Sequence, residues 1–143
     1  MVKRVPPPEA AELLKQGWTY LDVRSIPEFD QGHPAGAANV PLLHMQNGRM
    51  FPNPDFQKVV EASFPKDASI VVGCKTSGRS TQAAALMQAA GYANLVVMAG
   101  GFHGERDQLG RASTPGWAEA GLPVETAAPA DKTYQALSAS AKK

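Results

Sequence analysis

Residues 69–98 read SIVVGCKTSGRSTQAAALMQAAGYANLVVM, and this stretch decides the fold class. Its two ends, Ser69 to Gly73 and Asn94 to Met98, are short apolar runs of the kind found in strands buried on both faces of a parallel sheet. Residues 80–90 between them are rich in alanine and are followed by Gly91, which predicts a helix with a glycine at its end. A strand, a helix and a strand in this order form a βαβ unit. The chain is therefore predicted to be α/β.

Shorter elements are expected on either side of this unit. They are a helix over residues 8–15, a strand over 18–23, a helical turn over 26–31, a brief strand over 37–40 and an amphipathic helix over 55–64. Glycine and proline breaks predict a loop over residues 42–54. The segment 126–143 is rich in alanine, serine and lysine and is expected to be a flexible C-terminal tail. The prediction is one domain over residues 1–125, followed by this tail.

The composition is that of a soluble globular protein. The chain has 143 residues, of which 43% are hydrophobic and 19% charged. Its formal net charge of +1 gives no reason to expect nucleic acid or an anionic membrane as a partner. No apolar stretch approaches the ~20 residues of a membrane span, and none follows the basic start of the chain as in a signal peptide. A cytoplasmic location is the expectation.

Cys74 is the single cysteine of the chain. An intramolecular disulfide and a zinc site built from several thiolates are therefore excluded. Any sulfur chemistry must use Cys74 and finish on a partner from outside the chain.

The loop that begins at Cys74 lies between the buried strand and the alanine-rich helix. Ligands of open α/β sheets bind at this end of the strands, and backbone N–H groups at a helix N-terminus favour an anion. The basic residues Lys75 and Arg79 add to this preference, and the thiolate is the reactive form of cysteine. A lone cysteine is often an inert core residue, but such residues are seldom followed by a polar, basic loop. The pattern favours a nucleophilic Cys74.

Three motifs in the right order resemble the rhodanese family. Residues 74–80, CKTSGRS, are similar to its active-site loop, which often reads Cys-x-Ser-Gly-x-Arg-Ser. Residues 21–24, 28–29 and 32–41 resemble its amino-terminal motif. Gly100-Gly101-Phe102, Trp117 and residues 121–124 resemble its carboxyl-terminal motif. The resemblance spans roughly residues 5–125 and is greatest for stand-alone single-domain sulfurtransferases.

The resemblance implies a mainly parallel five-stranded sheet with helices on both faces. It also implies transfer of sulfur from thiosulfate to cyanide or a thiol through a persulfide on Cys74, with no metal or organic cofactor. Thioredoxin or glutathione could serve as the thiol. The backbone from residue 75 to 80 would cradle the persulfide, and Arg79 would hold the loop or bind substrate; these residues are Lys75, Thr76, Ser77, Gly78, Arg79 and Ser80. Asp22, Arg24 and His33 are expected to have structural roles.

Two departures from the family pattern stand out. The usual glycine two residues before the arginine is Ser77 here, and Gly78 follows it. An insertion, Phe102 to Gly116, separates Gly101 from Trp117 and carries Glu105, Arg106, Asp107 and Arg111. A solvated loop is the favoured interpretation of this insertion, and a border of the active-site mouth is the alternative.

Two other functions remain open. A Cdc25-like phosphatase or arsenate reductase would have a related fold, but those enzymes carry Cys-x5-Arg, whereas this chain has Cys-x4-Arg. The shorter loop favours a single sulfur over the larger phosphate or arsenate. A non-catalytic rhodanese-like module that binds a partner protein is the second alternative; such modules often lack the cysteine.

Overall fold

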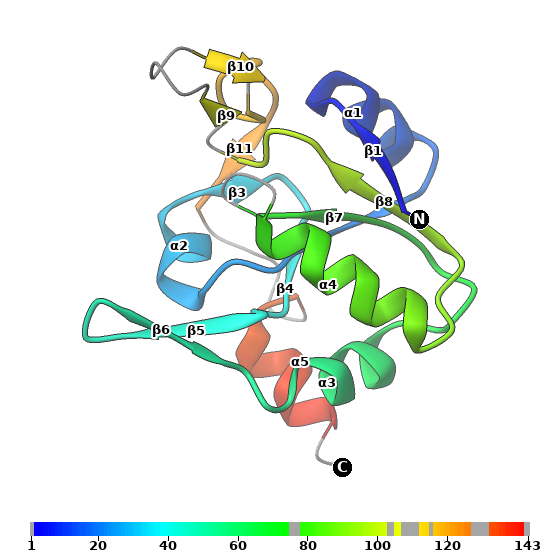
Figure 1. The fold of residues 1–143 in the computed structure, drawn as a ribbon, viewed down its shortest axis with the longest axis vertical. Coiled ribbons are helices and arrows are strands. Elements are labelled where there is room, and N and C mark those ends of the chain that lie inside the picture. Colours follow the sequence, from blue (N-terminus) through cyan, green and yellow to red (C-terminus); the bar gives the residue numbers. More distant parts are fainter. Residues whose placement is uncertain are drawn as a thin grey trace.

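A single parallel sheet forms the centre of the protein. The structure, a computed structural model, describes residues 2–74, 78–102, 105–106, 112–114, 116–126 and 132–141 (Figure 1). Five strands pair in the order β1-β8-β7-β2-β4, and every neighbouring pair is parallel. Their bounds are β1 Lys3–Val5, β8 Asn94–Met98, β7 Ser69–Gly73, β2 Thr19–Asp22 and β4 Ala38–Asn39. The predicted parallel α/β sheet is confirmed, and β7 and β8 have the predicted bounds.

Helices cover both faces of the sheet, as predicted. Alternate side chains of each strand point to opposite faces, so Ile70 and Val72 of β7 pack in one apolar cluster and Val71 in the other. The first cluster includes residues of α3 (Phe56–Ser63), α4 (Gly78–Ala89) and α5 (Tyr134–Ala141). The second includes residues of α1 (Pro7–Lys15) and α2 (Ile26–Gln31). In the part of the chain that the structure describes, no helix is long and apolar enough to cross a membrane.

The segment predicted as a loop over residues 42–54 is a β-hairpin, so this prediction was wrong. Strands β5 (Leu43–Gln46) and β6 (Arg49–Pro52) pair antiparallel. Asn47 and Gly48 connect them, and both have positive φ values, 53° and 76°. Two such residues form the tight turn whose twist matches that of a hairpin, and Asn-Gly is its strongest sequence signal. The hairpin extends from the body of the domain in Figure 1.

Two further strand pairs were not predicted. β3 (His33–Pro34) pairs antiparallel with β11 (Val124–Glu125). Within the insertion that begins at Phe102, β9 (Glu105–Arg106) pairs antiparallel with β10 (Ala112–Thr114) in a two-stranded sheet. Asp107 and Arg111, which the sequence analysis singled out, lie outside the described residues.

The C-terminal segment is held to the domain over residues 132–141, which corrects the expectation of a flexible tail there. Tyr134 of α5 is buried in the first apolar cluster, and its hydroxyl accepts a hydrogen bond from the Asn53 side chain at 3.2 Å. The Lys132 carbonyl accepts from the Asn39 N–H at 3.0 Å. These contacts join the segment to α3 and to the edge strand β4. Composition alone could not reveal them, because they depend on a surface made by distant parts of the chain.

Candidate active site

Cys74 directly follows β7, and its sulfur lies at the N-terminus of α4. The Ser80 backbone N–H donates a hydrogen bond to Sγ at 3.3 Å, and the thiol lies within hydrogen-bond distance of Ser80 Oγ, also at 3.3 Å. Cys74 is only 1% exposed and contacts the first apolar cluster. The sulfur is thus covered rather than open to solvent, but a backbone amide points at it. Such a donor stabilises a thiolate, as does the positive end of a twelve-residue helix.

The main chain around Cys74 is held from two sides. The Val23 N–H donates to the Gly73 carbonyl at 3.0 Å, and the Phe102 N–H donates to the Cys74 carbonyl at 2.7 Å. Gly73 packs so closely on the Tyr20 phenol ring that a methyl group at position 73 would overlap its hydroxyl. Burial raises the pKa of Tyr20 well above its usual value, so the phenol stays neutral. This packing leaves Cys74 in one defined position at the end of β7.

Asp22 and Arg24 form a buried ion pair at the end of β2. Arg24 Nη2 lies 2.7 Å from Asp22 Oδ2, and the Arg24 Nε and backbone N–H also donate to the carboxylate at 3.0 Å. Arg24 Nη2 donates to the Gly32 carbonyl at 2.6 Å, and the guanidinium lies 4.4 Å from the centre of the Phe102 ring. The Phe102 N–H in turn donates to the Cys74 carbonyl. The Asp22–Arg24 ion pair therefore contacts a residue that holds the main chain at Cys74. The geometry fits the structural role expected for both residues.

His33 is fully buried and connects α2 with the C-terminal part of the domain. Its Nδ1 lies 2.8 Å from the Phe29 carbonyl and its Nε2 lies 3.3 Å from the Glu125 carboxylate. The imidazole also stacks on the Phe29 ring, with 3.7 Å between the ring centres. Both ring nitrogens and the ring face of His33 contact Phe29 or Glu125, and none of these contacts is with Cys74. This geometry fits the structural role expected for His33.

Arg79, the second residue of α4, is paired with a carboxylate. Its Nη1 and Nη2 donate to the two oxygens of Glu28 at 2.7 and 2.9 Å. Glu28 Oε1 also accepts from the Ser25 N–H at 3.1 Å and the Ser25 hydroxyl at 2.8 Å. Burial acts to raise the pKa of Glu28, but the hydrogen bonds from Arg79 and Ser25 lower it to about 2. Of the two roles expected for Arg79, holding the loop fits this geometry, whereas binding substrate through a free guanidinium does not.

The structure brings together only part of the predicted loop. Gly78 begins α4 and is exposed, and Ser80 is buried against the sulfur. Lys75, Thr76 and Ser77 lie outside the described residues. Glu28 is a site residue that the sequence did not predict, because it was identified only as part of the amino-terminal motif. Its spacing from Ser25 matches a helix capping box, but nothing local in the sequence indicates its pairing with Arg79.

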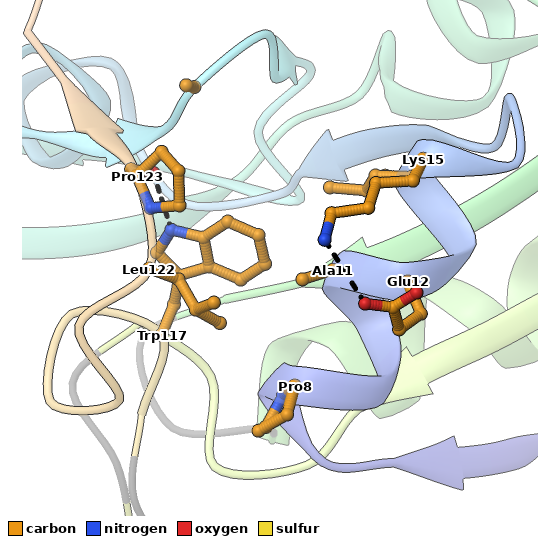
Figure 2. A pocket seen from close by; sticks show the side chains of 9 residues that line it. Pro8, Ala11, Glu12, Lys15, Trp117, Leu122 and Pro123 are labelled. Atoms are coloured by element: carbon orange, nitrogen blue, oxygen red, sulfur yellow. Dashed lines mark hydrogen bonds and ion pairs between the residues drawn. The ribbon is translucent and has the colours of Figure 1, made fainter.

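A hollow of about 470 Å³ lies between α1 and residues 117–123 (Figure 2). Trp117 and Leu122 line one wall, and the Trp117 indole N–H is already used by the Pro123 carbonyl at 2.7 Å. None of its lining residues belongs to the Cys74 site. Among the described residues, no group of three His, Cys, Asp or Glu side chains could hold a metal ion.

Comparison with known families matches residues 6–106 to the model described as Rhodanese-like domain. The chain belongs to this family. The match contains Cys74 and Ser80, the Asp22–Arg24 and Glu28–Arg79 pairs and His33, so the resemblance inferred from the motifs is confirmed.

Individual relatives of this rhodanese-like domain have more than one kind of name. It is 37% identical over 116 residues to "Thiosulfate sulfurtransferase 16, chloroplastic" of Arabidopsis thaliana, covering 81% of this chain and 87% of that protein. It is 33% identical over 93 residues to "Protein HIGH ARSENIC CONTENT 1, mitochondrial" of the same plant, covering 65% of this chain and 55% of that protein. Among solved structures, the M. tuberculosis protein Rv0390 is similar with a TM-score of 0.72 and 24% identity, over 88% of this chain and 98% of that one. The last match shows the fold alone, whereas the first places the chain in a family that includes proteins named as thiosulfate sulfurtransferases.

Because the pKa of Glu28 is lowered, the free energy of unfolding of the rhodanese-like domain is predicted to fall as this carboxylate is protonated at acidic pH. The carboxylate has a pKa of about 2 in the folded protein against an ordinary value of 4.5. Its contribution to stability is therefore complete above pH 4.5 and is lost as the pH falls toward 2. Glu28→Gln is expected to have a free energy of unfolding that falls less steeply than that of the wild type over this range, measured by urea unfolding at several pH values. Glu12→Gln, which removes an exposed pair with Lys15, is the control. Equal slopes for wild type and Glu28→Gln would contradict the prediction.

Proposed function

We propose that this protein moves a sulfane sulfur from a donor such as thiosulfate to a thiophilic acceptor through a persulfide on Cys74. The observation that carries this proposal is the 3.3 Å contact between the Ser80 backbone N–H and Cys74 Sγ at the start of α4. A fixed amide and a helix N-terminus favour the negative charge on sulfur. The same groups would favour the charge of a persulfide. The name of the Arabidopsis thiosulfate sulfurtransferase supports the choice of donor.

The reaction has two steps in this proposal. The Cys74 thiolate attacks the outer sulfur of thiosulfate, a new S–S bond forms, and the bond to the sulfite sulfur breaks as sulfite leaves with the electron pair. An acceptor then attacks the outer sulfur of the persulfide, and the Cys74 thiolate leaves. With cyanide the product is thiocyanate, and with a thiol it is a new persulfide. Because the enzyme holds the sulfur between the steps, the kinetics should be ping-pong.

The acceptor must be supplied from outside the chain. Cys74 is the single cysteine of the sequence, so the chain has no second thiol to attack the persulfide. Small thiols, glutathione and the dithiol of a thioredoxin have the required nucleophile. We propose this class of acceptor in addition to cyanide.

The proposal is tested by the mass of the intact protein. After incubation with thiosulfate and removal of excess reagent, the protein is expected to gain the mass of one sulfur atom, located on Cys74 by peptide mapping. Cyanide should then remove this mass and release a stoichiometric amount of thiocyanate. Initial rates at several fixed acceptor concentrations should give parallel double-reciprocal lines. A protein that gains no sulfur from thiosulfate, polysulfide or glutathione persulfide would refute the proposal.

Arsenate reduction is a second candidate, which the name of the Arabidopsis arsenic-related relative brings forward. The loop between Cys74 and Arg79 has four residues, whereas Cdc25-like enzymes, which act on the larger phosphate or arsenate group, have five. Sulfur transfer is therefore the better supported function. Arsenate reduction or phosphate-ester hydrolysis by the pure protein, faster than its sulfur transfer, would reverse this preference.

A further inference from the structure

We propose that Glu28 is a positioning residue for Cys74: through Arg79 it fixes the first turn of α4 and so places the Ser80 N–H against the sulfur. This inference rests on the proposed function, because it assigns Glu28 a role in the reactivity of Cys74. Glu28 touches neither the sulfur nor any group described as contacting it.

Glu28 is connected to the Cys74 sulfur through two residues, Arg79 and Ser80. Both nitrogens at the tip of Arg79 donate to both oxygens of Glu28, a two-point contact that fixes the plane of the guanidinium as well as its distance. Arg79 is directly followed by Ser80, whose backbone N–H is the donor to Cys74 Sγ. A shift of Arg79 therefore moves the peptide group that contacts the sulfur.

The anchor on the other side is itself fixed. Glu28 Oε1 closes a capping box with Ser25 at the start of α2. The next residue, Phe29, is buried and stacks on the buried His33 ring. The side chains of Glu28 and Arg79 are each only 15% exposed, so water competes less for this pair than for one on the surface. The pair thus joins two rigid elements rather than two mobile side chains.

Two explanations of the role of Glu28, its charge and its positioning of Arg79, predict opposite changes in the reactivity of Cys74 when the carboxylate is removed. Loss of the carboxylate leaves the positive charge of Arg79 without its partner near the sulfur. If charge alone mattered, the thiolate would become more favoured and thiosulfate, a dianion, would bind better. If position matters, the Ser80 N–H loses its alignment with Sγ and the chemical step slows.

The test uses variants that break the ion pair and spare the helix cap. Glutamine at position 28 can still accept from Ser25 and complete the capping box, so Glu28→Gln removes the charge while keeping α2 intact. Arg79→Met breaks the same pair from the other side, and the double variant completes a cycle. Glu61→Gln on α3, which removes an exposed pair with Lys66, is the matched control. Each protein is measured for kcat and KM with thiosulfate and cyanide, and for the alkylation rate of Cys74 by iodoacetamide as a function of pH.

Glu28→Gln and Arg79→Met are each expected to lower kcat by roughly 10- to 100-fold, the loss that a misplacement near 1 Å produces. KM should change by less than kcat, and the double variant should be no slower than the slower single variant. The alkylation rate of Cys74 at neutral pH should fall in both single variants, and Glu61→Gln should match the wild type. A Glu28→Gln protein with unchanged or higher kcat and faster alkylation would overturn the inference. Alkylation reports on Cys74 even if the wild type transfers no sulfur, so failure of the proposed function is distinguished from failure of this inference.

Discussion

Cys74→Ser is expected to abolish sulfur transfer. A serine hydroxyl is not ionised at neutral pH and cannot form a persulfide, so both steps of the proposed reaction lose their nucleophile. We expect kcat/KM with thiosulfate and cyanide to fall by on the order of 10³-fold or more, as when other covalent nucleophiles are removed. The serine variant should also gain no sulfur mass on incubation with thiosulfate.

This substitution also separates the enzyme from a module that only binds a partner. The oxygen of serine is smaller than sulfur, and it keeps a group that can hydrogen-bond to Ser80, so the fold should remain. An unfolding midpoint close to that of the wild type is the control. A Cys74→Ser protein that retains sulfurtransferase activity would show that the nucleophile lies elsewhere.

Arg24→Met is expected to produce a large loss of stability. It removes the cation from an ion pair in which both side chains are 1–2% exposed, and so leaves the Asp22 carboxylate buried without its partner. Breaking a buried pair from one side typically costs about 3–5 kcal/mol. The free energy of unfolding from urea denaturation measures this loss.

Two companion variants make the measurement specific. Asp22→Asn combined with Arg24→Met should recover part of the stability, because no unpaired charge is left in the interior. Lys15→Met removes an exposed cation paired with Glu12 and should cost less than about 1 kcal/mol. A loss of that small size for Arg24→Met would contradict the view that the pair supports the site.

Strands β7 and β8 could be predicted from sequence to the residue. Both are buried on both faces of the sheet, and this requirement produces uninterrupted apolar runs bounded by polar residues or glycine. The hairpin of β5 and β6 was missed for a different reason. Met45, Met50 and Phe51 are exposed, so the alternation typical of a half-buried strand is weak, and the Asn47-Gly48 turn was read as a break.

The position of α5 depends on tertiary contacts that leave little trace in the sequence. Its residues are mostly alanine and serine, and Tyr134 and Leu137 reach the apolar cluster. A short helix of this composition has little stability alone, and its packing on α3 provides the rest. Composition therefore suggested a loose tail where the structure has a packed helix.

In the candidate site too, local features could be predicted from the sequence, whereas tertiary contacts could not. The closeness of Cys74 and Ser80 follows from a short loop between a strand and a helix, so it could be expected from spacing. The contacts of Arg79 with Glu28 and of Cys74 with Phe102 join parts of the chain that are distant in sequence. A single sequence has no local pattern for such pairs, and the charge of Arg79 was accordingly assigned in part to substrate.

The pairing of β1 with β8 has a consequence for biosynthesis. β1 precedes the other strands of the sheet in the chain, yet its partner, with Lys3 opposite Val96, is made much later. β8 also completes the second edge of β7. A nascent chain that stops before β8 therefore displays an unpaired β1 and an open edge of β7, whose side chains are apolar, the kind of surface that aggregates or recruits chaperones. Translation must proceed well past the nucleophile before this sheet can close.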